Sequence, residues 1–249
     1  MNMKITGIIP ARYGSTRFPG KPLALLGGRP MLLHVFEHAS KSRLLTEVCV
    51  ATESLNIQEA CKSLSIPCLM TDPAHENPTS RLWEAAKSLP SDLYVMIGGD
   101  EPLLTGEDID LVIQAALNRM EDEKGLFVAN AMAPVLSPAE AMDTANIKVV
   151  CGEDGRGLYT SRFPIPYPKG ELNFTYWKFA SIGVYTRQAL DFFADTPKGP
   201  LETIEECDLL RFIEHNVPVY FTSTGHPSLS VDTKKDLRQA DLMIEQMQQ

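Results

Sequence analysis

The sequence predicts an α/β protein built on a mostly parallel sheet with helices on both faces. Through the first half of the 249-residue chain, apolar runs of strand length alternate with stretches of helical periodicity. Such alternation is typical of parallel sheets, whose strands are joined by helical crossovers. No repeat, low-complexity tract or linker divides the chain. Residues 1–249 are therefore expected to form one domain, which this length allows.

Five elements are expected in the first hundred residues. Strands are predicted at Lys4–Pro10, Glu47–Thr52 and Leu93–Ile97, and helices at Met31–Ala39 and Leu55–Leu64. Ligands of such sheets bind beyond the carboxyl ends of the strands. The loop that follows the first strand is thus expected to line a binding site.

The second half of the chain is less regular. After a predicted helix Glu107–Met120 and strand Leu126–Ala133, the stretch Cys151–Asn173 has alternating prolines that argue against a regular strand or helix. We expect the chain to leave the main sheet here as an irregular segment and to return through a strand Trp177–Tyr185. This irregular segment lies inside an insertion of about 151–200. The last expected elements are helices Arg187–Phe193 and Thr203–His215, a strand Val217–Thr222 and a helix from Lys235.

Charge and composition exclude several classes of function. The net charge of −9 argues against nucleic acid as a main partner, because binding its backbone needs a basic face. No apolar run reaches the about 20 residues of a membrane span, and the N-terminus has no signal-peptide pattern. The five cysteines lack metal-site spacing and are expected to be reduced structural thiols. We expect a cytoplasmic protein without membrane insertion.

The loop Pro10–Leu23 carries the most specific signal in the chain. It holds the cations Arg12, Arg17 and Lys21 together with two glycines and two hydroxyl side chains. Glycine lets backbone N–H groups approach an anion closely, and the cations supply charge, so a triphosphate is the expected ligand. An ATP-type P-loop is excluded because Pro22 stands where a hydroxyl should bind Mg²⁺. The alternative interpretation is a basic surface turn.

Two aspartates are candidate metal ligands. Asp100 follows an apolar strand within the string Gly98-Gly99-Asp100-Glu101-Pro102, which is how α/β enzymes place a carboxylate beside a phosphate site. Asp232, within Val231–Leu237, precedes the last helix. From the residues alone, Asp232 has two interpretations, a helix N-cap or a metal ligand.

These motifs resemble those of the sugar nucleotidyltransferases, in particular the 3-deoxy-manno-octulosonate (Kdo) cytidylyltransferases, or CMP-Kdo synthetases. The strings at 50–53 (VATE), 146–150 (NIKVV) and 158–162 (LYTSR) match further family strings, so the resemblance covers nearly the whole chain. It implies a Rossmann-like nucleotide-diphospho-sugar transferase fold. It also implies Mg²⁺-dependent coupling of CTP to a 3-deoxy-2-ulosonic acid for bacterial surface polysaccharide, by a homodimer assembled through the segment at about 151–200.

The resemblance assigns roles to individual residues. Arg12 and Lys21 would bind the triphosphate, and Asp100 and Asp232 would bind Mg²⁺; these four are the expected catalytic residues. Arg81 and Thr79 would bind the cytosine base. From the residues alone, Arg81 could equally be an exposed cation on a helix. The further expected nucleotide-binding residues are Ala11, Gly14, Ser15 and Arg17, and the expected sugar-binding residues are Arg162, Ser181, Tyr185 and Asp208.

Departures from the family pattern gather on the sugar side. Gly98, Ser181 and Leu209 replace a glutamine, a histidine and a glutamine of the family, so unchanged chemistry on an altered acceptor is expected. Pro78 stands in the base-reading segment, which puts the preference for cytosine in doubt. Kdo or a Kdo-like acid is the expected acceptor. The alternatives are a transferase for another sugar and an inactive nucleotide-binding homologue.

Overall fold

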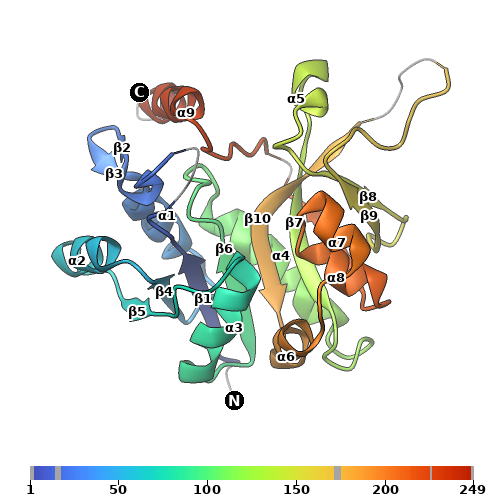
Figure 1. Cartoon of the computed structure of the whole chain (residues 1–249), viewed down its shortest axis with the longest axis horizontal. Helices are drawn as coiled ribbons and strands as arrows, with labels where there is room; N and C mark the ends of the chain where they lie inside the picture. Colours follow the sequence, from blue (N-terminus) through green and yellow to red (C-terminus); the bar gives the residue numbers. More distant parts are fainter. Residues whose placement is uncertain (1–2, 15–17, 171–174, 225, 248–249) are drawn as a thin grey trace. The chain divides into compact units, whose positions relative to one another are not determined.

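The computed structural model describes residues 3–14, 18–170, 175–224 and 226–247 (Figure 1). The chain divides into two compact units, which we call unit 1 (Met1–Asp110 with Ser228–Gln249) and unit 2 (Leu111–Pro227). Helix α4 (Gly106–Arg119) begins in unit 1 and continues into unit 2. The expectation that both units form one functional domain stays a prediction.

Unit 1 contains a parallel sheet in the order β6-β1-β4-β5. Strand β1 lies between β4 and β6, with Ile8 opposite Cys49 on one side and Met96 on the other, and its residues Ile8 and Ile9 are fully buried. The strands are β1 (Ile5–Pro10), β4 (Glu47–Thr52), β5 (Cys68–Met70) and β6 (Leu93–Ile97). The remaining elements of unit 1 are η1 (Lys21–Leu23), β2 (Leu25–Leu26), β3 (Arg29–Pro30), α1 (Met31–Ala39), α2 (Leu55–Ser63), α3 (Pro78–Ser88) and α9 (Lys234–Met247).

Helix α3 was not among the predicted elements, and its first residue is a proline. Asn77 is its N-cap, and the Asn77 side chain accepts a hydrogen bond from the Ser80 backbone N–H at 2.8 Å. Pro78 is the first helical residue, a position where the missing N–H costs nothing and the fixed φ suits the helix. Pro78 therefore starts a helix in the segment that we expected it to reshape.

Unit 2 contains a mixed sheet in the order β11-β7-β10-β8-β9. Strand β11 is parallel to β7, and the other pairs are antiparallel. Helix α8 packs on β9 (Figure 1). The strands are β7 (Val128–Pro134), β8 (Lys148–Cys151), β9 (Gly157–Ser161), β10 (Trp177–Tyr185) and β11 (Val219–Ser223), and the helices are α5 (Pro138–Met142), α6 (Arg187–Asp195), α7 (Pro200–Glu205) and α8 (Leu209–Glu214).

Two predictions about unit 2 were wrong in part. The irregular excursion was expected from residue 151, but a regular hairpin of β8 and β9 extends to Ser161, because the prolines begin only at Pro164. The single helix expected at Thr203–His215 is two helices, α7 and α8, separated where Glu206 adopts a left-handed φ of 47°. The predicted α/β class, with a mostly parallel sheet and flanking helices, is confirmed (Figure 1).

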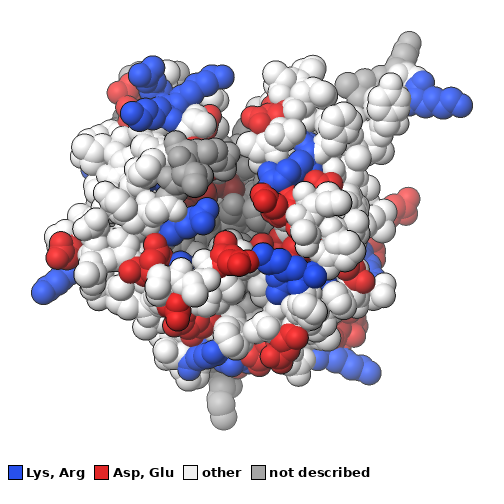
Figure 2. All heavy atoms as spheres, in the orientation of Figure 1, with Lys and Arg blue, Asp and Glu red and all other residues white. Residues whose placement is uncertain are grey.

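Charged residues are interspersed over the face drawn in Figure 2, where acidic and basic side chains alternate without one broad basic area. In the part of the chain that the structure describes, no helix has the length and apolar character needed to cross a membrane.

Candidate active site

The loop after β1 turns back on itself within unit 1. Ala11 is buried and continues the parallel pairing, since its N–H donates to the Ala51 carbonyl at 2.9 Å. The Gly20 N–H donates to the Tyr13 carbonyl at 2.9 Å, which closes the loop. Gly20 has a φ of 71°, and a Cβ there would lie 3.3 Å from the Tyr13 ring, so the turn favours glycine on both counts.

The structure describes only some of the predicted anion-binding residues of this loop. Arg12 and Gly14 are exposed, as a ligand-binding loop requires. Ser15 and Arg17 lie outside the described residues, so their roles stay predictions. Lys21 lies at the start of η1, directly after the loop has closed.

Lys21 joins the two predicted metal ligands. Its Nζ lies 2.7 Å from Asp100 Oδ2 and 3.1 Å from Asp232 Oδ1. The three side chains come from positions up to 211 residues apart in the sequence. Their side chains are only 14%, 31% and 22% exposed, so solvent screens their charges incompletely. The structure thus brings together three of the four expected catalytic residues.

The backbone fixes Asp100 and Asp232 beside each other. The Val231 N–H donates to the Asp100 carbonyl at 2.8 Å, which ties the segment before α9 to the end of β6. Gly99 passes close to β1, since a Cβ at this position would lie 3.1 Å from the Pro10 carbonyl oxygen. A side chain at position 99 would therefore crowd the end of β1 beside the loop.

Asp232 is not the N-cap of α9. That position belongs to Thr233, whose Oγ1 accepts from the Asp236 N–H at 3.3 Å while Asp236 Oδ2 accepts from the Thr233 N–H at 2.8 Å. This reciprocal pair is a capping box, and the Asp232 carboxylate lies against Lys21. The N-cap interpretation of Asp232 was therefore wrong.

The electrostatics of this cluster fit a cation. Burial lowers the pKa of Lys21, but the adjacent carboxylates of Asp100 and Asp232 raise it by more, so the net change is upward. Two carboxylates that converge on one ammonium can also converge on Mg²⁺, which typically takes one or two carboxylates plus phosphate oxygens and waters. Among the described residues, no group of three or more His, Cys, Asp or Glu side chains could hold a metal. A metal at Asp100 and Asp232 would therefore complete its coordination with waters or with oxygens of a bound nucleotide.

The expected base-reading residues are buried in the first turns of α3. The Thr79 side chain is fully buried, and its Oγ1 has no hydrogen-bond partner in the described chain. Arg81 is only 4% exposed and pairs with Glu53, its Nη2 lying 2.8 Å from Glu53 Oε2. The interpretation of Arg81 as an exposed helix cation was wrong. Glu53 was not predicted as a site residue, although it ends a string that matched the family.

Arg162, an expected sugar-binding residue of unit 2, donates hydrogen bonds to backbone carbonyl groups. Its Nε donates to the Glu205 carbonyl at 2.6 Å, its Nη1 to Thr144 at 3.0 Å and its Nη2 to Glu206 at 3.2 Å. The Arg162 N–H also donates to Glu205 Oε2 at 2.8 Å. Arg162 thus connects β9 to the end of α7, and its sugar-binding role stays a prediction.

The other three expected sugar-binding residues lie in different surroundings of unit 2. Ser181 lies at a bulge of β10, where the register with β7 shifts between Ala180 and Gly183. Tyr185 is 1% exposed, and its ring centroid lies 6.2 Å from that of Phe212. Asp208 precedes α8 as its N-cap residue, and the following Leu209 is buried. Their roles in binding an acceptor also stay predictions.

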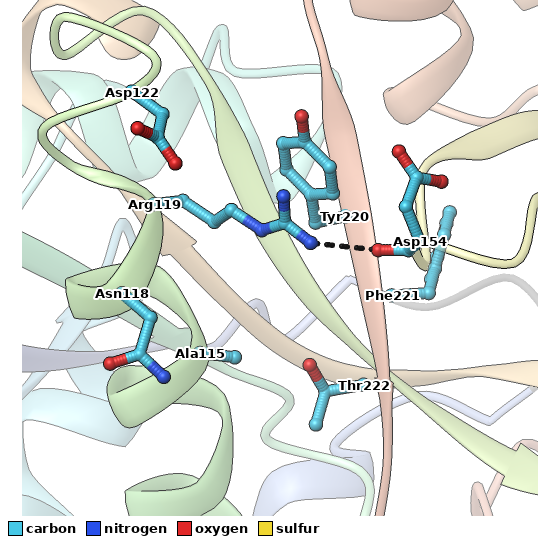
Figure 3. A pocket seen from close by; sticks show the side chains of 8 residues that line it. All are labelled: Ala115, Asn118, Arg119, Asp122, Asp154, Tyr220, Phe221 and Thr222. Atoms are coloured by element: carbon cyan, nitrogen blue, oxygen red, sulfur yellow. Dashed lines mark hydrogen bonds between the residues drawn. The ribbon is translucent and has the colours of Figure 1, made fainter.

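One pocket of about 280 Å³ lies in unit 2 (Figure 3). Arg119 crosses it with its guanidinium 4.2 Å from the Tyr220 ring centroid and donates to the Asp154 carbonyl at 2.8 Å. Burial and a hydrogen bond to Glu123 raise the pKa of Tyr220 to about 12. None of the predicted site residues lines this pocket, so we assign it no role.

Comparisons with known proteins decide the family. The model of a family described as cytidylyltransferase matches residues 6–221. The chain is 36% identical to the 3-deoxy-manno-octulosonate cytidylyltransferase of Desulfosudis oleivorans over 249 residues, which covers 98% of this chain and 99% of the relative. The chain belongs to the cytidylyltransferase family. The family match extends through both units of this cytidylyltransferase.

Other relatives of this cytidylyltransferase differ in their acceptor. It is 35% identical to the 8-amino-3,8-dideoxy-manno-octulosonate cytidylyltransferase of a Shewanella species, over 96% of this chain and 98% of the relative. Among solved structures, it is similar to a CMP:2-keto-3-deoxy-manno-octonic acid synthetase complexed with CTP, with a TM-score of 0.89 and 33% identity over 98% of this chain and 99% of that one. A cytidylyltransferase from Leptospira borgpetersenii shares the fold, with a TM-score of 0.64, 18% identity, and coverage of 98% of this chain and 87% of that one.

Proposed function

We propose that this cytidylyltransferase transfers CMP from CTP to a 3-deoxy-2-ulosonic acid of the Kdo type and releases pyrophosphate, as a step of lipopolysaccharide or other surface-polysaccharide synthesis. The observation that carries the proposal is the convergence of Lys21, Asp100 and Asp232 beside a glycine-containing loop at the end of β1. Relatives that match over nearly their whole length are named for this activity. The similar solved structure is a complex with CTP.

In the proposed reaction, the anomeric hydroxyl oxygen of the acceptor attacks the α-phosphorus of CTP. The bond between the α-phosphorus and the bridging oxygen of the β-phosphate breaks, pyrophosphate leaves, and the hydroxyl proton passes to solvent. No side-chain nucleophile is needed, so the protein contributes position and charge. Arg12 and Lys21 would neutralise the phosphate oxygens.

Asp100 and Asp232 are the proposed Mg²⁺ ligands. When bound, Mg²⁺ supplies neutralisation of the phosphate charge and lowers the pKa of the attacking hydroxyl. The two carboxylates would hold it against the nucleotide. The backbone hydrogen bond from the Val231 N–H to the Asp100 carbonyl keeps the two segments side by side. The Lys21 ammonium, which contacts both carboxylates, is then available for phosphate oxygens.

The proposed acceptor is an eight-carbon 3-deoxy-2-ulosonic acid. Relatives of similar identity are named for Kdo and for its 8-amino-8-deoxy analogue, which differ at a carbon far from the reacting hydroxyl. Of the three departures from the family pattern, Ser181 lies at a bulge, and bulges often re-aim side chains beside active sites. We propose that the reaction is that of the family and that the acceptor is Kdo or a close analogue.

The test is pyrophosphate release by purified protein with Mg²⁺. The matched acceptors are Kdo, 8-amino-3,8-dideoxy-manno-octulosonate and an ulosonic acid of different chain length, each with CTP and with UTP. We expect turnover with at least one eight-carbon acid and a preference for CTP. Release of pyrophosphate with none of the acids would contradict the proposal and favour the inactive nucleotide-binding homologue.

A cytoplasmic homodimer is the proposed assembly. Unit 2 exposes large apolar side chains around the β8–β9 hairpin and its neighbours, among them Leu158 (60% exposed), Phe163 (62%) and Ile204 (79%). Burying such side chains is favourable, and a second copy of the chain is the partner that the family resemblance suggests. Light scattering should give twice the mass of one chain; a mass of one chain would count against the dimer.

A further inference from the structure

Glu53 contacts two parts of the nucleotide site that lie far apart in the sequence. It follows β4 directly, and its Oε1 accepts from the Tyr13 backbone N–H at 3.2 Å. Its other oxygen, Oε2, lies 2.8 Å from Nη2 of Arg81 on α3. One carboxylate thus connects the phosphate loop to the helix that carries the buried residues Thr79 and Arg81.

We propose that Glu53 is a positioning residue that holds Arg81 and the phosphate loop in one fixed arrangement, and so sets both the affinity for CTP and the discrimination between nucleobases. The inference rests on the proposed function. Glu53 does not have to touch the substrate for this role, because it acts through Arg81 and through the Tyr13 backbone.

The Arg81 guanidinium is held from two sides. Its Nη1 donates to Thr71 Oγ1, and Thr71 follows β5 with its N–H donating to the Thr52 carbonyl at 2.9 Å. Glu53 follows β4, the strand that pairs with β5. The ends of two adjacent strands therefore orient one planar cation, which leaves little rotational freedom for a side chain that is otherwise long and flexible.

The polar groups around Arg81 indicate a ligand that hydrogen-bonds. Thr79 Oγ1 is buried and has no hydrogen-bond partner in the described chain, although a buried hydroxyl without a partner is costly. Thr79 lies two residues before Arg81 in the first turn of α3. A nucleobase, which offers donors and acceptors on its edge, would satisfy this hydroxyl.

Glu53 also balances two cations. The pKa of Arg81 is lowered overall, chiefly by burial, while the charges of Glu53 and Glu84 raise it and the charge of Arg12 lowers it further. Glu53 neutralises Arg81 while bonding to the backbone one residue beyond Arg12. Removing the carboxylate leaves a buried guanidinium without its ion pair, beside a second cation.

The experiment compares Glu53→Gln and Glu53→Asp with Glu84→Gln as a matched control. Glu84 also lies near Arg81, but its carboxylate accepts from the Asp72 N–H at 2.9 Å and bonds to His75 instead. The readouts are the dissociation constant of CTP by calorimetry, KM and kcat, the ratio of kcat/KM for CTP over UTP, and the melting temperature.

We expect Glu53→Gln to weaken CTP binding and raise KM by about tenfold or more, with a smaller change in kcat and a CTP-over-UTP ratio that falls severalfold. Glu53→Asp should recover part of the affinity, because it restores the charge, and Glu84→Gln should stay within about threefold of the wild type. A purely structural role would lower the melting temperature and spare both KM and the nucleotide ratio.

Thr71→Val is the second variant, in case Glu53→Gln does not fold. It removes the hydrogen bond that the same guanidinium donates to Thr71, beside the ion pair with Glu53, with little change in volume, so CTP binding should weaken in the same direction. Unchanged CTP affinity and an unchanged nucleotide ratio in a folded Glu53→Gln or Thr71→Val protein would overturn the proposal. Calorimetry with CTP alone decides this, whereas the acceptor panel decides the proposed reaction, so the two failures are distinguishable.

Discussion

Unit 1 and unit 2 use their predicted site residues in different ways. In unit 1, Lys21, Asp100 and Asp232 come together from three distant segments and satisfy one another's charge. In unit 2, Arg162 donates to three backbone carbonyls, and Tyr185 is buried against Phe212. Three residues with expected catalytic roles thus pair with one another in unit 1, whereas in unit 2 Arg162 and Tyr185 contact backbone and core groups.

The difference follows from where the residues lie on their sheets. All strands of the unit 1 sheet run in parallel, so the segments after β1, β4 and β6 emerge at one edge and their polar side chains meet there. Most pairs in unit 2 are antiparallel, and its expected sugar-binding residues come from two strands and from the start of a helix. Shared chemistry is therefore expected from the unit 1 cluster, and two of the three departures on the sugar side, Ser181 and Leu209, lie in unit 2.

The largest expected effect is the loss of turnover when a unit 1 carboxylate is removed. Asp100→Asn and Asp232→Asn should each lower kcat by about a thousandfold or more, because the amide no longer carries the charge that binds a cation. The control is Asp92→Asn, since Asp92 is exposed and only accepts from the Lys4 N–H. Near-normal kcat in either variant, with an unchanged melting temperature, would remove the metal assignment.

Lys21→Met should separate two roles of the lysine. Turnover should fall by about a hundredfold, because a cation for the triphosphate is lost. The affinity of the protein for Mn²⁺ without nucleotide, measured by electron paramagnetic resonance, should rise about tenfold, since the ammonium no longer competes for Asp100 and Asp232. Lys62→Met, on the exposed side of α2, should change neither quantity. Weaker Mn²⁺ binding by Lys21→Met would show that the carboxylates do not form a metal site.

Arg162→Met tests whether unit 2 supports the fold rather than the substrate. Three charge-assisted hydrogen bonds to carbonyls are lost from a partly buried residue, so the free energy of unfolding should fall by about 2–4 kcal/mol, and the melting temperature with it. KM for the acceptor should change less than threefold in the folded protein. An unchanged melting temperature together with a strongly raised acceptor KM would show that Arg162 acts on the substrate and not on the fold.

The sequence predicted the elements of both units better than their contacts. Met31–Ala39, Glu47–Thr52 and Trp177–Tyr185 have the expected bounds, because their periodicity is local and uninterrupted. Helix α3 was not among the predicted elements, although Pro78 occupies its first turn, where proline is favoured. Within the candidate site, residue types were predictable from their motifs, but their partners were not.

Glu53 and Arg162 show why the partners could not be predicted. Glu53 ends a string that only matched the family, and its partners Tyr13 and Arg81 lie 40 and 28 residues away, so no local pattern indicates the contact. Arg162 resembled a substrate ligand in its motif, whereas its hydrogen bonds depend on the chain returning near residue 205. Such pairs are set by tertiary packing, which a single sequence does not encode in its periodicity.

The smallest expected effect comes from Thr233, which occupies the N-cap of α9 next to Asp232. Thr233→Ala removes one half of the capping box and should cost about 1 kcal/mol, or about 2–4 °C in melting temperature. Thr233→Ser keeps the hydroxyl and should be nearly neutral. Because Asp232 faces Lys21 rather than the helix, kcat of Thr233→Ala should fall by less than about fivefold. A loss as large as that of Asp232→Asn would mean that the cap, and not the carboxylate alone, places the catalytic charge.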